Sequence, residues 1–327
     1  MSLDADHIVD RRRMRRKLTF WRVISVLMAV VVIVAGTLVL SRGRTGLTDG
    51  TSGAIARVNI EGLIRSNRER TEALERLGKS SAKAVIVRIN SPGGTVSGSE
   101  QLYDSLTKLK AEKPIVVVID GLAASGGYIA AMAADQIVAQ QSAIVGSIGV
   151  LFQYPNVSEL LKTIGVQVES IKSSPLKAAP NGFEPTSPEA RAAVEALVLD
   201  SYAWFKSLVS DRRKLEGGAL DRVADGRVFT GRQALELKLI DRLGNEQTAV
   251  DWLAKEKQID PKTPVRDYRL QPRLGDLPFL KVAAVGVFDA VGLGAFARRL
   301  EEWGALQAIE RLNLDGLLAL WHPPSSN

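Results

Sequence analysis

Short apolar runs alternate with helical stretches through the middle of the chain. Runs rich in Val, Ile and Ala predict β-strands at residues 54–60, 84–89, 114–119, 136–139 and 143–150. Helical patterns occupy residues 65–77, 97–111 and 128–134, and residues 121–127 are expected to form a turn. Ser187-Pro188-Glu189-Ala190 predicts the capped start of a long helix that ends near Lys214. This order predicts an α/β layered fold with parallel strand pairings.

One apolar stretch near the N-terminus has a different character. Residues 23–40 carry no charge, and 18 helical positions span ~27 Å, close to the ~30 Å hydrocarbon core of a membrane. A basic cluster precedes them, made of Arg11, Arg12, Arg13, Arg15, Arg16 and Lys17. By the positive-inside rule the N-terminus is cytoplasmic, and the rest of the chain lies outside the membrane. A cleaved signal peptide is the alternative, but the apolar run exceeds the usual length of ~7–15 residues.

These features divide the chain into five expected parts. Residues 1–19 form a cytoplasmic basic segment, 20–40 a transmembrane anchor and 41–53 a glycine-rich linker. Residues 54–250 form the catalytic domain, and residues 251–327 a C-terminal extension of unknown role. Charges interrupt the apolar runs of that extension, which disfavours a second membrane span.

The amino-acid composition excludes several kinds of catalytic and metal-binding site. The 327 residues include no cysteine and only two histidines, His7 and His322, one near each end of the chain. Disulfides, thiolate metal sites and a cysteine nucleophile are therefore excluded, and a Ser-His-Asp triad is disfavoured. The net charge of +7 is concentrated in the N-terminal basic cluster, and no nucleic-acid-binding motif is present. The sequence predicts no cofactor, no metal and no nucleic-acid partner.

Two glycine-rich turns follow two of the predicted strands. Asn90-Ser91-Pro92-Gly93-Gly94 follows the first, and Ala123-Ala124-Ser125-Gly126-Gly127-Tyr128 follows the second. Each turn alone is compatible with ordinary strand-to-helix packing. Together they indicate a site, because Ser125 would lie at a helix N-terminus flanked by glycine N–H donors, where negative charge is stabilised.

Five ordered motifs carry a family resemblance. The two turns, together with Val145-Gly146-Ser147-Ile148-Gly149-Val150, resemble the signal peptide peptidase SppA family, whose fold is related to ClpP and crotonase. Ser173-Ser174-Pro175-Leu176-Lys177-Ala178 and the segment at residues 226–234 also match. The resemblance covers residues 54–250 and departs from the commoner family spelling at Ser174 and Ala178.

The resemblance implies a Ser-Lys dyad. Ser125 matches the nucleophile and Lys177 the general base, while Gly94 and Gly126 supply oxyanion N–H groups and Ser147 orients the lysine. With no histidine or cysteine available, lysine is also the natural partner of a serine nucleophile, provided that burial removes its charge.

Two other residues compete for roles beside the nucleophile. Lys172 is a rival base, but it ends an alternating strand pattern and is expected to be exposed. Asp120 is rejected as a third member, because a carboxylate would stabilise a charged lysine.

The resemblance further implies a membrane serine endopeptidase that cleaves apolar peptides such as signal-peptide remnants. It implies a homo-oligomeric ring in which each subunit completes its neighbour's site. The expected location is the bacterial inner membrane, with the catalytic domain on the periplasmic side. The alternative functions are a non-catalytic scaffold and an acyl-CoA enzyme of the same fold.

Overall fold

A mainly parallel sheet lies at the centre of the computed structural model, which describes residues 51–270 and 318–320. The eight strands are β1 (Ile55–Glu61), β2 (Ala84–Ser91), β4 (Ile115–Ala124), β5 (Gln136–Ala139), β6 (Ile144–Gly146), β7 (Val228–Thr230), β8 (Arg242–Leu243) and β9 (Val265–Asp267). Their order is β7-β6-β4-β2-β1-β9, and β5 pairs with β4 and with β8. The β6–β7 pair is antiparallel, and every other pair in this sheet is parallel.

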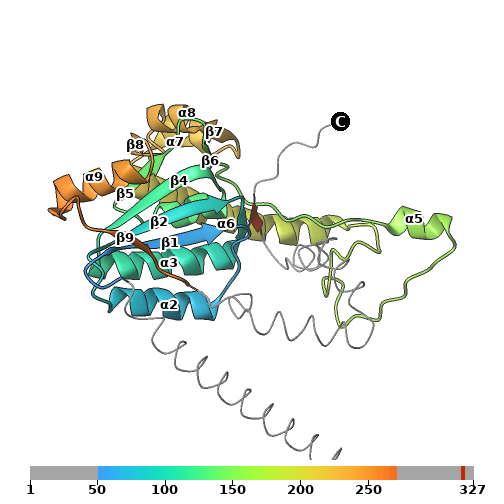
Figure 1. Cartoon of the computed structure of the whole chain (residues 1–327). Helices are drawn as coiled ribbons and strands as arrows, with labels where there is room; N and C mark the ends of the chain where they lie inside the picture. The colour runs from blue at the N-terminus through green and yellow to red at the C-terminus, as the bar shows by residue number, and fades with distance from the viewer. Residues whose placement is uncertain (1–50, 271–317, 321–327) are drawn as a thin grey trace, which may run out of the picture. The chain divides into compact units, whose positions relative to one another are not determined.

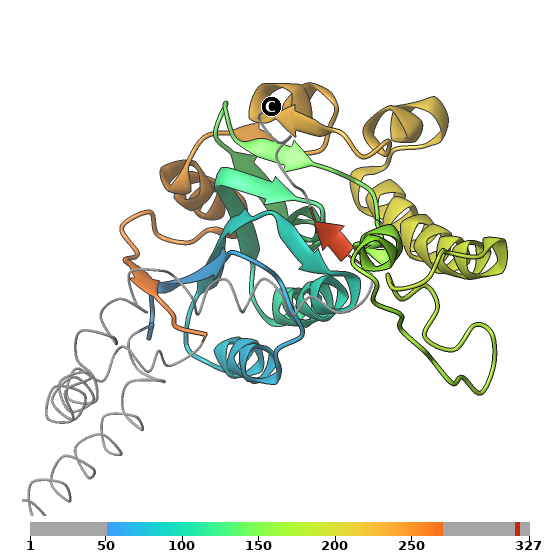
Figure 2. The same ribbon diagram turned by 90° about the vertical axis from the view of Figure 1, so that its right-hand side faces the viewer.

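Helices follow most of the strands (Figures 1 and 2). They are α2 (Arg68–Gly78), α3 (Val96–Glu112), α4 (Gly126–Ala131), α5 (Ser158–Thr163), α6 (Pro188–Arg213), α7 (Gly217–Val223), α8 (Gly231–Glu236) and α9 (Glu246–Lys257). A separate two-stranded sheet joins β3 (Gly93–Thr95) to β10 (Leu318–Leu320).

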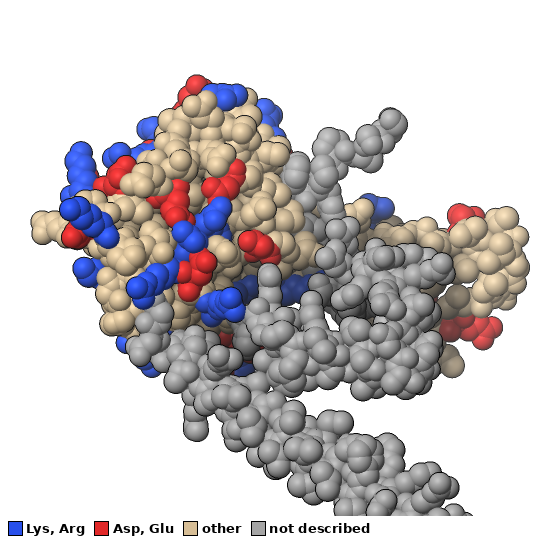
Figure 3. Space-filling model, in the orientation of Figure 1, with Lys and Arg blue, Asp and Glu red and all other residues tan. Residues whose placement is uncertain are grey.

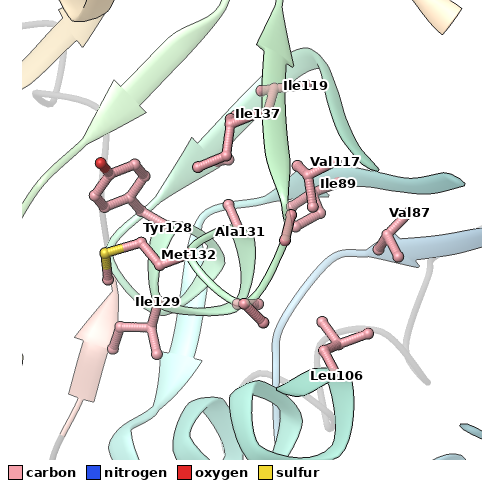
Figure 4. Close-up of a cluster of buried hydrophobic side chains, with 14 of the residues drawn as sticks. Val87, Ile89, Leu106, Val117, Ile119, Tyr128, Ile129, Ala131, Met132 and Ile137 are labelled. Atoms are coloured by element: carbon pink, nitrogen blue, oxygen red, sulfur yellow. The ribbon is translucent and has the colours of Figure 1, made fainter. Parts of the chain in front are cut away.

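Alternating residues of the central strands bury two different cores. In β4, Val117 and Ile119 face the helices α2, α3, α4 and α6, whereas Val116 and Val118 face α9. Strands covered on both faces are expected to be apolar throughout, which is the pattern that predicted them. Figure 4 shows the first core, where Tyr128 of α4 and Met132, which caps the end of α4, lie among the strand side chains.

Local capping chemistry sets where two of the helices begin. The Asn67 side chain accepts a 2.8 Å hydrogen bond from the Arg70 amide, so α2 starts three residues later than the pattern predicted. The Ser187 hydroxyl accepts a 3.1 Å bond from the Ala190 amide, and α6 ends at Arg213 with Lys214 as its C-cap, close to the predicted end.

A long arm leaves this α/β body. We use the name arm for residues 151–187, which carry α5 at their far end (Figure 1). The residues before Lys172 form no strand, although an alternating strand pattern was expected to end there. The arm and the adjoining part of α6 hold most of the exposed large apolar side chains: Phe152, Leu160, Ile164, Val166, Val168, Ile171, Leu176, Phe183, Leu197 and Leu199.

Three further differences from the sequence prediction concern boundaries. The predicted turn at residues 121–127 is wrong in its first half, because β4 continues to Ala124 by changing partner from β5 to β6. The predicted strand at residues 143–150 is shorter, and only Ile144–Gly146 is paired. The expected boundary at residue 250 falls inside α9, and β9 beyond it pairs with β1.

Several expectations lie outside the described residues. These are the basic cluster, the apolar run at residues 23–40, most of the linker, both histidines and the apolar runs of the C-terminal extension. Within residues 51–270 and 318–320, no helix has the length and apolar composition needed to cross a bilayer.

Candidate active site

Ser125 occupies the sharp junction between β4 and α4. Its backbone has φ 53° and ψ −117°, a conformation that residues with a side chain rarely adopt. The residue is 1% exposed, and its hydroxyl forms no hydrogen bond with any other described residue. A strained, buried serine with an uncommitted hydroxyl is typical of a nucleophile that is held in place by its surroundings.

The start of α4 leaves amide groups available beside Ser125. The carbonyl oxygen of Ser125 accepts hydrogen bonds from Tyr128 and Ile129, at 2.9 and 3.0 Å. The Gly126 amide has no backbone partner in the described part of the chain. Gly127, the next residue, packs closely against Ser91 at the end of β2, because a Cβ at Gly127 would lie 2.8 Å from the Ser91 carbonyl oxygen. The serine, the first free amide of α4 and the turn after β2 are therefore packed together.

The turn after β2 is shaped by a buried hydroxyl. Ser91 is 0% exposed, and its Oγ donates to the Gly62 carbonyl at 2.6 Å and accepts from the Gly93 amide at 3.1 Å. The chain then runs as β3 beside Ile64, with hydrogen bonds from Ile64 N to Gly93 O at 2.8 Å and from Thr95 N to Ile64 O at 2.9 Å.

Gly94 has to be glycine at this position. A Cβ there would lie 1.8 Å from the Ile64 carbonyl oxygen. The backbone groups of successive strand residues point to opposite sides. The Gly93 carbonyl and the Thr95 amide form hydrogen bonds with Ile64. The peptide N–H and C=O of Gly94, the residue between them, therefore face away from Ile64.

Ser147 stands next to Ser125 in the sheet. Ala124 of β4 pairs with Gly146 of β6, so the two serines directly follow paired residues. Ser147 has φ 52°, is 8% exposed, and its amide donates a 2.8 Å hydrogen bond to the Arg227 carbonyl. Ser125, Ser147, Gly126 and the β3 turn therefore lie at the same end of the sheet.

Lys177 is placed differently from expectation. It lies in the arm, is exposed, and forms no hydrogen bond with Ser125 within the described residues. Its amide donates to the Ser174 carbonyl at 3.1 Å, in a turn. Among the described residues of the single chain, Lys177 is therefore not buried beside Ser125 as the sequence analysis expected.

Lys172 also differs from the prediction. Its side chain is 16% exposed, and its ammonium lies 2.8 Å from the Glu184 carboxylate. The predicted exposure was wrong because the chain folds back between residues 172 and 184. The Lys172 ammonium is committed to Glu184 and forms no hydrogen bond with Ser125 in the described part of the chain, so Lys172 is poorly placed to act as a base.

Asp120 is committed to other partners. Its carboxylate accepts a 2.7 Å hydrogen bond from Arg88 Nε and a 3.5 Å bond from Gln140. Its exclusion from the site agrees with this pairing.

Within the described ranges, no group of three or more His, Asp or Glu side chains is placed to hold a metal ion.

Several elements of the site were not predicted from the sequence. The hydroxyl of Ser91 was not assigned a role, although a serine before Pro-Gly-Gly is a turn-forming residue. Nothing local marked Ile64 as the partner of Gly94, or Leu318–Leu320 as a strand, because both contacts join distant parts of the chain.

The chain is similar in sequence to known peptidases. The model of "Peptidase family S49" matches residues 107–260, and the "Clp protease" model matches residues 68–145. A Synechocystis sp. protein provisionally named a protease is 39% identical over 209 residues, covering 63% of this chain and 76% of that protein. Protease 4 of Salmonella typhi is 39% identical over 180 residues, covering 54% of this chain and 29% of that protein.

Two further matches complete the comparison. An Enterococcus faecium protein provisionally named signal peptide peptidase SppA is 34% identical over 184 residues, covering 56% of this chain and 54% of that protein. Among solved structures, a ClpP1 mutant from Listeria monocytogenes is similar at 15% identity with a TM-score of 0.40, covering 58% of this chain and 91% of that chain. On the sequence matches, this chain belongs to peptidase family S49, the family of the SppA signal peptide peptidases, and is a serine protease.

Proposed function

We propose that this protein is a membrane-anchored serine endopeptidase that uses a dyad of Ser125 and Lys177 to cleave apolar peptides. The observation that carries the proposal is the strained, 1% exposed Ser125, which has no hydroxyl partner among the described residues and lies beside the amides of α4. Backbone strain is retained where the surrounding structure holds a residue for its chemistry.

The proposed reaction begins with proton transfer from Ser125 Oγ to the neutral amine of Lys177. The freed oxygen attacks the substrate carbonyl carbon, and the negative charge moves to the carbonyl oxygen. Amides of Gly94 and Gly126 stabilise this oxyanion. When it collapses, the peptide C–N bond breaks, and the protonated Lys177 gives its proton to the leaving amine. A water that loses its proton to Lys177 then attacks the acyl group and releases it from Ser125. Ser147, which follows the residue paired with Ala124, orients the lysine by a hydrogen bond.

Lys177 reaches this site from a neighbouring subunit in our proposal. The lysine is exposed in the single chain, and the arm that carries it also exposes apolar side chains such as Val166, Val168 and Leu176. Figure 3 shows charges of both signs over the body, whereas the visible part of the arm is mostly uncharged. An apolar extension of this kind favours association with another copy of the chain. Packing against that copy would bury Lys177 and remove its charge.

The proposed substrates are apolar peptides such as signal-peptide remnants. A relative from Enterococcus faecium is provisionally named for this activity. The single span at residues 20–40 would hold the enzyme in the bacterial inner membrane, on whose outer side such remnants would be cleaved. Protease added to intact spheroplasts should digest a C-terminal tag and spare an N-terminal one. Digestion of the N-terminal tag alone would place the catalytic domain in the cytoplasm.

The nucleophile is tested by labelling. A serine-reactive fluorophosphonate should modify the purified chain at Ser125, located by peptide mass spectrometry. Ser125→Ala should abolish both labelling and peptidase activity, with little change in the unfolding midpoint because the two side chains are similar in size. Ser105→Ala is the matched control, since Ser105 is also buried but bonds to Gln101 in α3. Labelling that persists in Ser125→Ala would refute the assignment, and an unlabelled wild-type chain would favour a non-catalytic scaffold.

A further inference from the structure

Arg65 is a half-buried cation without a counter-charge at the border of the candidate active site. It directly follows Ile64, whose backbone amide and carbonyl form hydrogen bonds with β3 on both sides of Gly94. Two guanidinium nitrogens of Arg65, Nε and Nη2, are shielded from solvent and have no hydrogen-bond partner among the described residues. Buried donors in native proteins are nearly always paired, so Arg65 requires an acceptor from outside the described chain.

The two unpaired nitrogens are the ones that bind a carboxylate side-on. Arg57 shows this geometry within the same chain, since its Nε and Nη2 donate to the two carboxylate oxygens of Glu246, each at 2.6 Å. Such a two-bond pair is stronger and more specific than a single hydrogen bond. A carboxylate is therefore the acceptor that would satisfy both nitrogens of Arg65 at once.

The surroundings of Arg65 fix its position and add a second positive charge. A Cβ at Gly98, in the first turn of α3, would lie 2.5 Å from the Arg65 carbonyl carbon. Nη2 of Arg70 donates a 2.7 Å hydrogen bond to the Arg65 carbonyl oxygen. Burial lowers the pKa of Arg70, which has no ion pair within the described ranges. The two arginines together form a rigid cationic spot that attracts an acidic group.

The arm carries one acidic side chain that is not yet paired. Its charged residues are three glutamates and three lysines, and two of each pair within the arm: Lys162 with Glu159 and Lys172 with Glu184. Glu169 and Lys177 are both exposed, and neither has an ion-pair partner in the described part of the chain. The unpaired lysine is the one assigned above to a neighbouring subunit. The unpaired carboxylate lies on the same arm and requires a cation.

The spacing along the arm allows both groups to reach one neighbouring subunit. Glu169 precedes Lys177 by eight residues, which span up to about 28 Å when extended. Arg65 follows the residue that fixes Gly94, so it borders the site that Lys177 would enter. The substrate is a poorer source of the carboxylate, because the proposed substrates are apolar.

We propose that Glu169 of the arm forms an ion pair with Arg65 of a second copy of the chain and thereby fastens the arm to that copy. The proposal rests on the proposed function, since it takes the same arm to deliver Lys177 to that copy's Ser125. The pair would satisfy Nε and Nη2 of Arg65 and neutralise the one unpaired glutamate of the described arm.

The first experiment measures contact between copies by cross-linking. The chain has no cysteine, so introduced thiols are the only ones present. Arg65→Cys and Glu169→Cys are combined in the full chain and treated with a short bismaleimide, because an ion pair of two long side chains holds the backbones too far apart for a disulfide. We expect covalent multimers on a denaturing gel.

Arg65→Cys with Glu159→Cys is the matched control, because Glu159 already pairs with Lys162 inside α5. This pair should give far fewer multimers. Equal multimer yields from the two pairs, or links formed only within single chains, would overturn the proposal.

The second experiment reverses the charges. Arg65→Glu and Glu169→Arg should each weaken assembly about 30-fold or more, measured by analytical ultracentrifugation over a concentration series, because each variant places like charges together. The double variant should recover assembly, which a misfolded chain would not do. Arg68→Glu is the control, since Arg68 is exposed and pairs with Glu72 on its own helix. A double variant that assembles no better than the weaker single variant would refute the pair.

Neither measurement requires catalysis, so the two proposals can fail separately. A chain that cross-links and recovers assembly as expected, but has no peptidase activity, would refute the proposed function and support the ion pair. An active peptidase that fails both tests would refute the ion pair alone.

Discussion

The amide nitrogen of Ser125 donates a 2.7 Å hydrogen bond to the carbonyl oxygen of Gly146. This bond ties the end of β4 to the end of β6 and holds Ser125 in its positive-φ conformation beside Ser147. It also consumes the serine's own amide. The Gly126 amide is then the first of α4 that remains available for a developing oxyanion.

Gly94→Ala should damage both stability and activity. The new methyl group would lie 1.8 Å from the Ile64 carbonyl oxygen, so β3 must shift away from Ile64. We expect a loss of about 1–3 kcal/mol in the free energy of unfolding and a large fall in kcat/KM. Urea unfolding and peptide hydrolysis measure the two effects. Gly218→Ala is the control, because a Cβ there meets no atom within 4 Å; a Gly94→Ala chain as stable and active as that control would contradict this role for β3.

Sites shared between subunits predict complementation. Ser125→Ala and Lys177→Ala chains should each be inactive alone, because each lacks one half of the dyad. Mixed, dissociated and reassembled at equal amounts, they should recover about a quarter of wild-type activity, since random neighbours supply both groups at that frequency. Recovery is measured on one peptide substrate at fixed total protein. A mixture that forms mixed oligomers and stays inactive would show that each site draws both residues from one chain.

The two lysines of the arm should behave differently. Lys177→Ala should lower kcat/KM by about 10²–10⁴-fold, the usual contribution of a general base. Lys177→Arg should be as damaging, because a guanidinium does not release its proton. Lys172→Ala removes only the pair with Glu184 and should cost much less than Lys177→Ala. The proposed dyad is wrong if Lys172→Ala is the inactive chain and Lys177→Ala retains activity.

The Lys172–Glu184 pair predicts an acid-sensitive arm. Hydrogen bonds from Lys172 and then Asn181 lower the pKa of Glu184, so its carboxylate favours the folded arm at neutral pH. This contribution is present above the unfolded pKa of about 4.3 and is lost as pH falls through the lowered value. Hydrogen exchange in the arm, corrected for intrinsic rates, should therefore rise at acid pH.

Glu184→Gln should show part of this increase already at neutral pH. Glu159→Gln is the matched control, because Glu159 pairs with Lys162 within α5 and links no distant segments. Equal exchange rates at neutral pH in wild type and Glu184→Gln would rule out a role for the pair in fastening the arm.

Local patterns were sufficient for most of the body. The runs that became β1, β2 and β5 were predicted within a residue or two, because strands buried on both faces require apolar side chains throughout. The long helix α6 was also predicted, since Ser187 and Pro188 carry their own start signal. Ser125 could be placed at a strand-to-helix junction because small residues surround it in sequence.

The sequence by itself therefore determined the α/β body and the position of the candidate nucleophile, through interactions between residues close in the chain. Only the tertiary structure decided that Ile64 fixes Gly94, that Leu318–Leu320 covers β3, and that Lys172 pairs with Glu184 while Lys177 is exposed. Each of these contacts joins residues that a long or irregular segment of the chain separates. Hydrophobic periodicity and capping chemistry cannot predict such contacts, because both depend on residues only a few positions apart.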